Sequence, residues 1–250
     1  MKPIAMITGA TSGIGEAAAK ILADSHYLIL TGRRKERLEA LAKKLEIKTD
    51  CLLLNFDVRD QHIIEDEIRD LPENWRSIDV LINNAGNAHG LSTIQEGDLN
   101  DWEAMIDINV KGLLYVSKAI IPGMIERKRG TIINIGSIAG IEVYPKGNVY
   151  NASKYAVHAL TQGMRMDLNP FGIRVCEIKP GLVETEFSLV RFKGDEQKAR
   201  SVYQGFEPLV AQDVADAIHY VVSRPPHVTI ADMVILPTAQ ASATLINKKL

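Results

Sequence analysis

The feature that most constrains the fold is an alternation of short apolar runs with longer amphipathic stretches along the whole chain. Most of the apolar runs are continuous, which is typical of parallel strands that helices cover on both faces. The predicted strands are residues 3–8, 27–31, 51–56, 79–82, 131–135, 174–178 and 228–236. The predicted helices are residues 14–23, 35–45, 63–71, 102–123, 150–168 and 211–223. Strands that alternate with helices in this way predict an α/β fold with a doubly wound parallel sheet.

No linker, internal repeat or low-complexity tract divides the chain, and we therefore expect one domain over residues 1–250. A charged segment at residues 187–205 follows a strand and interrupts the pattern, which predicts a short helical lid. The chain has 29 Lys and Arg residues against 31 Asp and Glu residues. This balance argues against a nucleic acid or an anionic membrane as partner, because both require an excess of basic residues.

The apolar runs and the cysteines bear on the cellular location. No apolar run is long enough to span a bilayer, and the short run near the N-terminus does not resemble a signal sequence. Cys51 and Cys176 are the only cysteines, which are too few for a disulfide framework. We therefore expect a cytoplasmic protein with no membrane partner.

A glycine-rich turn, Thr-Gly-Ala-Thr-Ser-Gly-Ile-Gly, occupies residues 8–15 between the first predicted strand and the first predicted helix. Glycines allow a tight turn there, and the backbone amides at the helix N-terminus can bind a pyrophosphate. The turn predicts a dinucleotide site in a Rossmann-type sheet, although a glycine-rich turn without a ligand is the alternative. The expected contacts come from Gly9, Thr11, Ser12, Gly13, Ile14 and Gly15.

The end of the second predicted strand indicates which cofactor this site prefers. A fold that selects NAD usually has an acidic residue there, which binds the 2′-hydroxyl of the adenosine ribose. This chain instead has Arg33 and Arg34, whose guanidinium groups can bind a 2′-phosphate. The alternative is a solvated helix start, but cations at a helix N-terminus are unfavourable unless an anion compensates them. We therefore expect NADP(H) as the cofactor.

Tyr150 and Lys154 lie four residues apart at the start of a predicted helix and therefore share one face of it. Ser137 follows the predicted strand 131–135, at the end of the sheet where such folds bind ligands. A tyrosine acts as a base near neutral pH only if its phenolate is stabilised by about 4 kcal/mol. The ammonium of Lys154 could supply part of that stabilisation. Alone, the Tyr–Lys pair would be an ordinary amphipathic pair; with Ser137 and the glycine turn it predicts acid–base catalysis.

These features occur together with Asn83-Asn84-Ala85-Gly86, Asn109 and Pro180-Gly181, in order along the chain. Over essentially its whole length the sequence resembles the short-chain dehydrogenase/reductase family. The resemblance implies that Tyr150 is the general acid and base, that Lys154 lowers its pKa and that Ser137 positions the reacting oxygen. It also implies that Asn109 holds a water in a proton relay that reaches solvent through Lys154.

The resemblance assigns further residues to the cofactor and implies a homotetramer. Asn83, Ala85 and Gly86 would contact the adenosine ribose, and Asp57 and Val58 would contact the adenine. The carboxamide end of the nicotinamide would be held by Pro180, Gly181, Val183 and Thr185. The predicted helices 102–123 and 150–168 carry more apolar surface than one sheet face needs, which also favours a closed oligomer.

Within the family, residues 31–34, 180–183, 185–188 and 190–195 are similar to the NADP-dependent 3-hydroxy acid dehydrogenases that oxidise serine and L-allo-threonine. The similarity implies a small 3-hydroxy acid or 3-oxo acid substrate, such as 3-hydroxyisobutyrate or malonic semialdehyde. Arg191 is the expected partner of the substrate carboxylate, because a guanidinium binds a carboxylate through two hydrogen bonds. Lys193 and Lys146 are the other cations in segments expected to overhang the cleft. The alternative is that Arg191 and Lys193 belong to a solvated lid face.

Two other functions stay open from the sequence. One is a reductase of a neutral carbonyl or an acyl substrate on the same scaffold, and the other is a non-catalytic NADP-sensing protein. The presence of Ser137, Tyr150 and Lys154 favours an enzyme. The six histidines have no ligand-like spacing, and no metal is expected because hydride transfer to a nicotinamide requires none.

Overall fold

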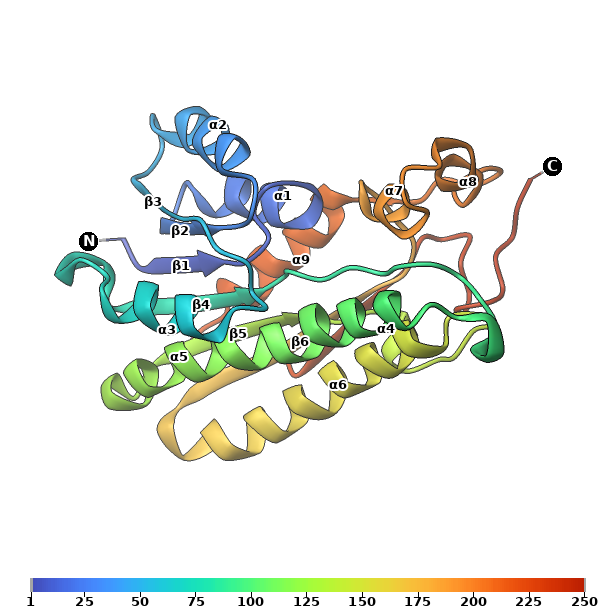
Figure 1. Ribbon diagram of the computed structural model, residues 1–250. Helices are drawn as coiled ribbons and strands as arrows, with labels where there is room; N and C mark the ends of the chain where they lie inside the picture. The colour runs from blue at the N-terminus through green and yellow to red at the C-terminus, as the bar shows by residue number, and fades with distance from the viewer. Residues whose placement is uncertain (1, 250) are drawn as a thin grey trace.

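The computed structural model describes residues 2–249 and has a seven-stranded sheet between two layers of helices (Figure 1). The strand order is β3-β2-β1-β4-β5-β6-β9, and every neighbouring pair is parallel. The strands are β1 (Ile4–Ile7), β2 (Tyr27–Thr31), β3 (Cys51–Leu54), β4 (Ile78–Asn83), β5 (Gly130–Ile135), β6 (Ile173–Pro180) and β9 (Asp232–Ile235). The doubly wound, Rossmann-type sheet predicted from the sequence is therefore confirmed.

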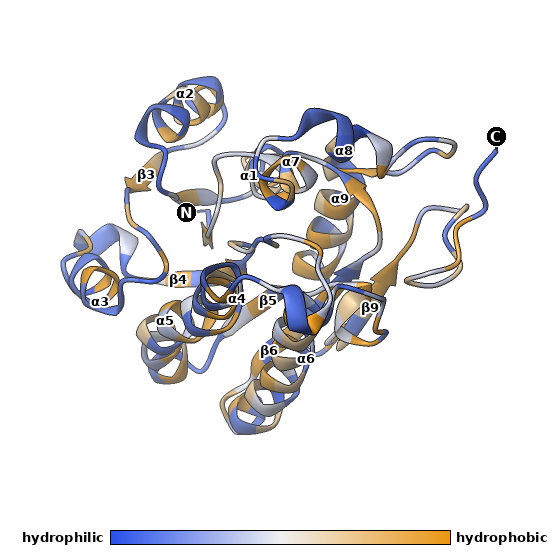
Figure 2. Cartoon of the chain, turned by 45° about the vertical axis from the view of Figure 1, so that its right-hand side comes forward, coloured by the Kyte–Doolittle hydropathy of each residue, from blue (hydrophilic) through white to orange (hydrophobic). Residues whose placement is uncertain are grey.

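Helices cover both faces of this sheet, as Figure 2 shows from a second direction. The residues of one core cluster come from α1 (Gly13–Leu22), α2 (Lys35–Leu45) and α9 (Ala211–Val222), which pack on one face. On the other face lie α3 (Gln61–Arg69), α5 (Leu113–Arg127) and α6 (Asn148–Leu168). Because both faces are covered, the central strand β1 is apolar along its whole length, and all four of its residues are buried.

The predicted helix 102–123 is longer in the structure and is not regular. It consists of α4 (Leu99–Ile106), a π-helical turn at Asp107–Gly112 and α5. The apolar periodicity did not predict the beginning of α4, because Leu99 is exposed. The helix begins after the N-cap Asp98, which accepts a hydrogen bond from the amide of Asn100. Gly112 allows the π-helical turn to approach Val58, since a Cβ atom on Gly112 would lie 2.7 Å from Cγ2 of Val58.

The predicted strand 228–236 is also corrected, because only Asp232–Ile235 pairs with β6. The helical lid expected at residues 187–205 is confirmed as α7 (Phe187–Arg191) and α8 (Glu196–Ser201). It lies between two short strands, β7 (Val183–Glu184) and β8 (Leu209–Val210), which form a separate parallel pair. These strands have two residues each, which is too short to give a sequence pattern. Between residues 2 and 249, no helix has both the length and the apolar character needed to span a membrane.

Candidate active site

A cavity of about 540 Å³ opens at the carboxyl ends of the strands, beneath α7. This is where open parallel sheets bind their ligands, at the point where the strand order reverses. It brings together most of the residues that the sequence predicted for the site. Those that line it are Gly9, Thr11, Ser12, Gly13, Ile14, Arg33, Arg34, Asp57, Val58, Ala85, Gly86, Ser137, Tyr150, Lys154, Pro180, Gly181, Val183, Thr185 and Arg191.

The glycine-rich turn between β1 and α1 has a backbone conformation that favours glycine at two positions. Gly9 and Gly13 have φ angles of +67° and +53°, which favour glycine. A Cβ atom on Gly9 would lie 3.0 Å from the Cα of Ala85, so a side chain there would press against the backbone that follows β4. Gly15 does not line the cavity; a Cβ atom there would lie 2.3 Å from the carbonyl oxygen of Gly9. Gly15 therefore lets α1 pack closely against the turn, and the first residues of α1 line the cavity.

Asn83 is not placed as the resemblance implied. Its side chain points away from the cavity and donates hydrogen bonds to Ser117 Oγ at 3.0 Å and Asn134 Oδ1 at 2.9 Å. The neighbouring Asn84 lines the cavity instead and donates to the carbonyl oxygens of Thr8 and Gly9 at 2.9 and 3.2 Å. Asn83 is the last residue of β4, and strand alternation directs it into the layer of α5.

The two arginines at the end of β2 differ in their partners. Arg34 donates to Thr11 Oγ1 at 2.9 Å, to Ser12 Oγ at 2.8 Å and to the carboxylate of Glu186 at 2.9 Å. Arg33 is exposed and has a longer contact, 3.6 Å, with Asp57. Arg33 therefore has the guanidinium that is less committed to other groups of the chain.

Glu186 is the anion that compensates the cations at the start of α2. Its carboxylate binds Arg34 at 2.9 Å and Arg37 at 2.7 Å, and the hydrogen bond from Arg34 lowers the pKa of Glu186. The sequence alone indicated no role for this residue. Only an indirect signal for Glu186 was present in the sequence. Cations at a helix N-terminus require a compensating anion, and the phosphate of the cofactor was the only anion expected there.

The residues predicted to form the reaction centre lie in the first turns of α6 and at the end of β5. Tyr150 is buried, and its burial raises the pKa of its hydroxyl, as does the nearby Tyr144; Arg191 and Ser137 act in the opposite direction. The chain alone therefore keeps Tyr150 protonated, which is the form that donates a proton to a carbonyl. Lys154 lies 6.0 Å from the centre of the Tyr150 ring and donates to the carbonyl oxygen of Ile135 at 2.8 Å.

Lys154 is itself buried, and burial lowers its pKa to about 8, whereas the charge of Glu177 raises it. Asn109 lies in the π-helical turn and does not line the cavity. Its side chain accepts from the amide of Asn87 and donates to Asn87 O and Ser153 Oγ, at 2.8, 2.8 and 3.0 Å. A Cβ atom on Gly86 would lie 3.2 Å from Asn109 Oδ1 and 3.6 Å from Lys154 Nζ. Asn109 and Lys154 therefore face the same glycine.

Arg191 of the lid lies over the reaction centre. Its guanidinium carbon is 5.1 Å from the ring centre of Tyr150, 5.6 Å from that of Tyr144 and 5.7 Å from that of Phe187. One terminal nitrogen donates to the hydroxyl of Tyr144, whereas Nε is buried and finds no hydrogen-bond partner among residues 2–249. Arg191 lines the cavity, and no carboxylate of residues 2–249 pairs with its guanidinium, so its charge is available to an anion there.

The other cations considered for the substrate lie elsewhere. Lys146 is exposed and does not line this cavity, and Lys193 binds Asp101 at 3.0 Å on the surface. The C-terminal segment supplies a wall that the sequence did not indicate. Gln240 Oε1 accepts a hydrogen bond from the amide of Leu182 at 2.8 Å, and Gln240 lines the cavity. No local pattern in the sequence could have placed Gln240 there.

Comparisons with known proteins agree with this geometry. The family model described as short chain dehydrogenase matches residues 3–195. The NADP-dependent 3-hydroxy acid dehydrogenase YdfG of Salmonella typhi is 46% identical over 244 residues, covering 97% of this chain and 98% of that protein. Sulfoacetaldehyde reductase 2 of Chromohalobacter salexigens is 45% identical and covers 96% of both chains.

Among solved structures, the closed form of serine dehydrogenase complexed with NADP⁺ superimposes with a TM-score of 0.93. That structure is 44% identical and covers 97% of this chain and 98% of its own. The family match spans more than half of the chain, and the relatives are matched over nearly their full length. The chain therefore belongs to the short-chain dehydrogenase family.

Proposed function

We propose that the chain is an NADP-dependent oxidoreductase that interconverts small 3-hydroxy acids and 3-oxo acids. Serine, L-allo-threonine, 3-hydroxyisobutyrate and malonic semialdehyde are the substrates expected. One observation carries the substrate class: the guanidinium of Arg191 lines the cavity 5.1 Å from the ring centre of Tyr150 and pairs with no carboxylate in residues 2–249. The names of the 3-hydroxy acid dehydrogenase and serine dehydrogenase relatives support it.

The residues of the cavity fit NADP(H). The turn at Gly9 and Gly13 and the start of α1 would hold the pyrophosphate, because the turn offers backbone amides and excludes side chains. Arg33 and Arg34 would hold the 2′-phosphate, and Asp57 and Val58 would contact the adenine. The nicotinamide end would be held by Pro180, Gly181, Val183 and Thr185. When bound in its oxidised form, this cofactor accepts a hydride from the carbon that bears the substrate hydroxyl.

The side chains of the reaction centre manage the proton. Tyr150 takes the proton of the substrate hydroxyl during oxidation and returns it to the carbonyl oxygen during reduction. The ammonium of Lys154 favours the phenolate form of Tyr150, and the hydroxyl of Ser137 orients the reacting oxygen. Arg191 binds the carboxylate and so fixes which carbon faces the cofactor. Asn109, which faces the same glycine as Lys154, would extend the proton path toward solvent.

Reduction of sulfoacetaldehyde is a second candidate function, supported by the two sulfoacetaldehyde reductases among the relatives. In malonic semialdehyde and in sulfoacetaldehyde alike, a single methylene group separates the aldehyde carbon from the anionic group. A guanidinium placed over Tyr150 could therefore bind either anion, since a sulfonate offers the same paired oxygens as a carboxylate. A neutral carbonyl substrate would leave Arg191 without that partner.

The test follows NADPH absorbance with purified protein and a panel of substrates. The panel contains malonic semialdehyde, sulfoacetaldehyde, serine, L-allo-threonine, 3-hydroxyisobutyrate and neutral ketones and secondary alcohols, each with NADP(H) or NAD(H). We expect turnover with NADP(H) on anionic substrates, and loss of turnover in Tyr150→Phe with NADPH binding retained. Activity confined to neutral substrates would refute the substrate class, and full activity of Tyr150→Phe would refute the mechanism. Binding of NADPH without any turnover would favour the NADP-sensing alternative.

We also infer a homotetramer, which rests on the family resemblance and on apolar side chains exposed along α5 and α6. Leu114 on α5 and Tyr155 and Met166 on α6 have exposed fractions of 37%, 40% and 72%. Size-exclusion chromatography with light scattering tests this state; a monomer at micromolar concentration would contradict it. The single-domain organisation and the cytoplasmic location stay predictions from the sequence.

A further inference from the structure

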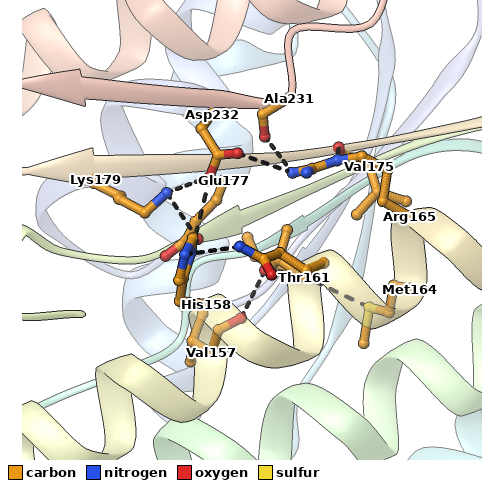
Figure 3. Close-up of polar contacts among 12 residues, drawn as sticks. Val157, His158, Thr161, Met164, Arg165, Val175, Glu177, Lys179, Ala231 and Asp232 are labelled. Atoms are coloured by element: carbon orange, nitrogen blue, oxygen red, sulfur yellow. Dashed lines mark hydrogen bonds and ion pairs between the residues drawn. The ribbon is translucent and has the colours of Figure 1, made fainter. Parts of the chain in front are cut away.

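A second group of charged side chains lies outside the cavity, between α6, β6 and β9 (Figure 3). Its centre is Glu177 of β6, whose side chain is fully buried. One carboxylate oxygen, Oε2, accepts a hydrogen bond from Nδ1 of His158 at 2.6 Å and forms an ion pair with Nζ of Lys179 at 3.0 Å. Lys179 also binds Asp232 of β9, which binds Arg165 of α6 at 3.3 Å. We call these five residues the Glu177 cluster.

The charges of the Glu177 cluster balance without a charge on His158. Two carboxylates, those of Glu177 and Asp232, face the two cations Lys179 and Arg165. Nε2 of His158 lies 2.9 Å from the side-chain amide of Gln162, which can donate to it while Nδ1–H donates to Glu177. The ammonium of Lys179 lies between the two carboxylates and provides the positive charge that a metal ion would otherwise supply.

The other oxygen of Glu177 points toward the reaction centre. Oε1 is buried and has no hydrogen-bond partner in the described part of the chain. It lies against Gly136, because a Cβ atom on that glycine would be 2.1 Å from Oε1. The residue before this glycine, Ile135, offers the carbonyl oxygen that accepts the hydrogen bond from Lys154. A buried carboxylate and a buried ammonium therefore lie against adjacent residues at the end of β5.

A buried anion near a buried cation favours the charged form of both groups. Burial lowers the pKa of Lys154 to about 8, and the charge of Glu177 opposes that effect. The titratable and charged groups that face Glu177 are Lys154, His158 and Arg165 of α6, Lys179 of its own strand and Asp232 of β9. The neighbouring strand β5 has no charged residue.

We propose that Glu177 is a positioning residue for the reaction, whose carboxylate keeps Lys154 in its ammonium form from outside the cavity. Lys154 in turn stabilises the phenolate of Tyr150, so Glu177 acts on the proton transfer without touching the substrate. Lys179 limits this effect, because it partly neutralises the carboxylate. The inference rests on the proposed roles of Tyr150 and Lys154.

The test compares the pH dependence of alcohol oxidation in three variants. Glu177→Gln removes the charge at nearly constant shape and leaves Asp232 to pair with Lys179. We expect its oxidation rate near neutral pH to fall about tenfold and to recover at higher pH. Loss of the opposite charge of Glu177 lowers the pKa of Lys154 by about one unit or more, so the phenolate of Tyr150 is less stabilised. Asp232→Asn is the matched control: it removes one charge from the same cluster on the side away from Gly136, and its profile should stay that of the wild type.

Lys179→Met should move the profile in the opposite direction, toward lower pH, because the carboxylate of Glu177 then acts on Lys154 with less neutralisation. A purely structural role for the cluster would not produce shifts of opposite sign. The pKa of Tyr150 should shift in the same directions when it is measured without turnover. It is obtained from the tyrosinate absorbance of each protein saturated with NADP⁺, after subtraction of the absorbance of its Tyr150→Phe counterpart. Full turnover of Tyr150→Phe would refute the proposed role of Tyr150, whereas this titration separately tests Glu177.

A wild-type profile for Glu177→Gln by both measurements would overturn the inference, and so would an equal shift in Asp232→Asn. If Glu177→Gln does not fold, Lys179→Met decides alone. A profile that stays in place or moves toward higher pH in Lys179→Met overturns the role of Glu177, and a move toward lower pH supports it.

Discussion

Replacement of Arg191 by Met should remove the binding of the substrate anion while keeping an unbranched side chain over Tyr144, Tyr150 and Phe187. The guanidinium now lies within 5.7 Å of all three ring centres, and its Nε has no partner among residues 2–249. Hydrogen bonds to charged groups contribute about 1.5–3 kcal/mol each. Loss of two such bonds to a carboxylate, about 3–6 kcal/mol together, should therefore lower kcat/KM for malonic semialdehyde by at least about a hundredfold.

The assay should follow reduction rather than oxidation, because Arg191 also lowers the pKa of Tyr150. Reduction uses the protonated form of Tyr150, which the loss of Arg191 does not disfavour. Lys193→Met is the matched control. It removes a cation from the same segment, but this cation binds Asp101 on the surface. Arg191→Lys should give an intermediate loss, because an ammonium keeps the charge without the paired donors.

A small neutral aldehyde provides the comparison that decides the matter. Its kcat/KM should change less than about threefold in Arg191→Met, because no anion is bound in its case. Equal losses on the neutral and the anionic aldehyde would refute the reasoning and make Arg191 a structural support of the lid. Unchanged kinetics on malonic semialdehyde would refute it as well.

Three further predictions concern the cofactor end and the core. Glu186→Gln should tighten NADPH binding by up to about fivefold and leave NADH binding unchanged. The exposed ion pair of Glu186 with Arg34 competes with the 2′-phosphate and contributes up to about 1 kcal/mol. Weaker NADPH binding in a fluorescence titration would contradict this. Arg33→Ala should weaken NADPH binding by about tenfold to a hundredfold with little change for NADH, since one charge-assisted contact is lost; equal losses would exclude a role in recognising the 2′-phosphate. Asn134→Ala should lower the free energy of unfolding in urea by about 1–3 kcal/mol, because the buried amide of Asn83 loses a hydrogen-bond acceptor; a change below about 0.5 kcal/mol would show that the network around Asn83 contributes little.

The sheet and the glycine turn could be predicted because their signals are local. Parallel strands covered on both faces are mostly apolar, as β1 is at every position, and a continuous apolar run shows this directly. The turn at Gly9 and Gly13 requires positive φ angles, which glycine adopts at little cost. The π-helical turn at Asp107–Gly112 left no such signal, since its residues continue the helical pattern on both sides.

The contacts that shape the cavity join residues far apart in the chain, and no local pattern predicts them. Glu186 meets Arg34 across 152 positions, and Gln240 meets Leu182 across 58. The choice between Asn83 and Asn84 required the register of β4, because a shift of one residue turns a side chain to the other face of the sheet. The family resemblance predicted the correct segment of the chain. The structure was needed to show that Asn84, not Asn83, faces the cavity.

The distribution of charge along the cavity favours an anionic substrate by a second route. Among the described residues that line it, the carboxylates are Asp57 and Glu186, and both are bound to arginines at the adenosine end. The reaction end has Lys154 and Arg191 and no lining carboxylate between residues 2 and 249. The anion that supports Lys154, Glu177, lies outside the cavity, where it can favour the ammonium without repelling a substrate carboxylate at close range. An acidic residue inside the cavity would support Lys154 equally well, but it would also cancel the attraction that Arg191 exerts on the substrate.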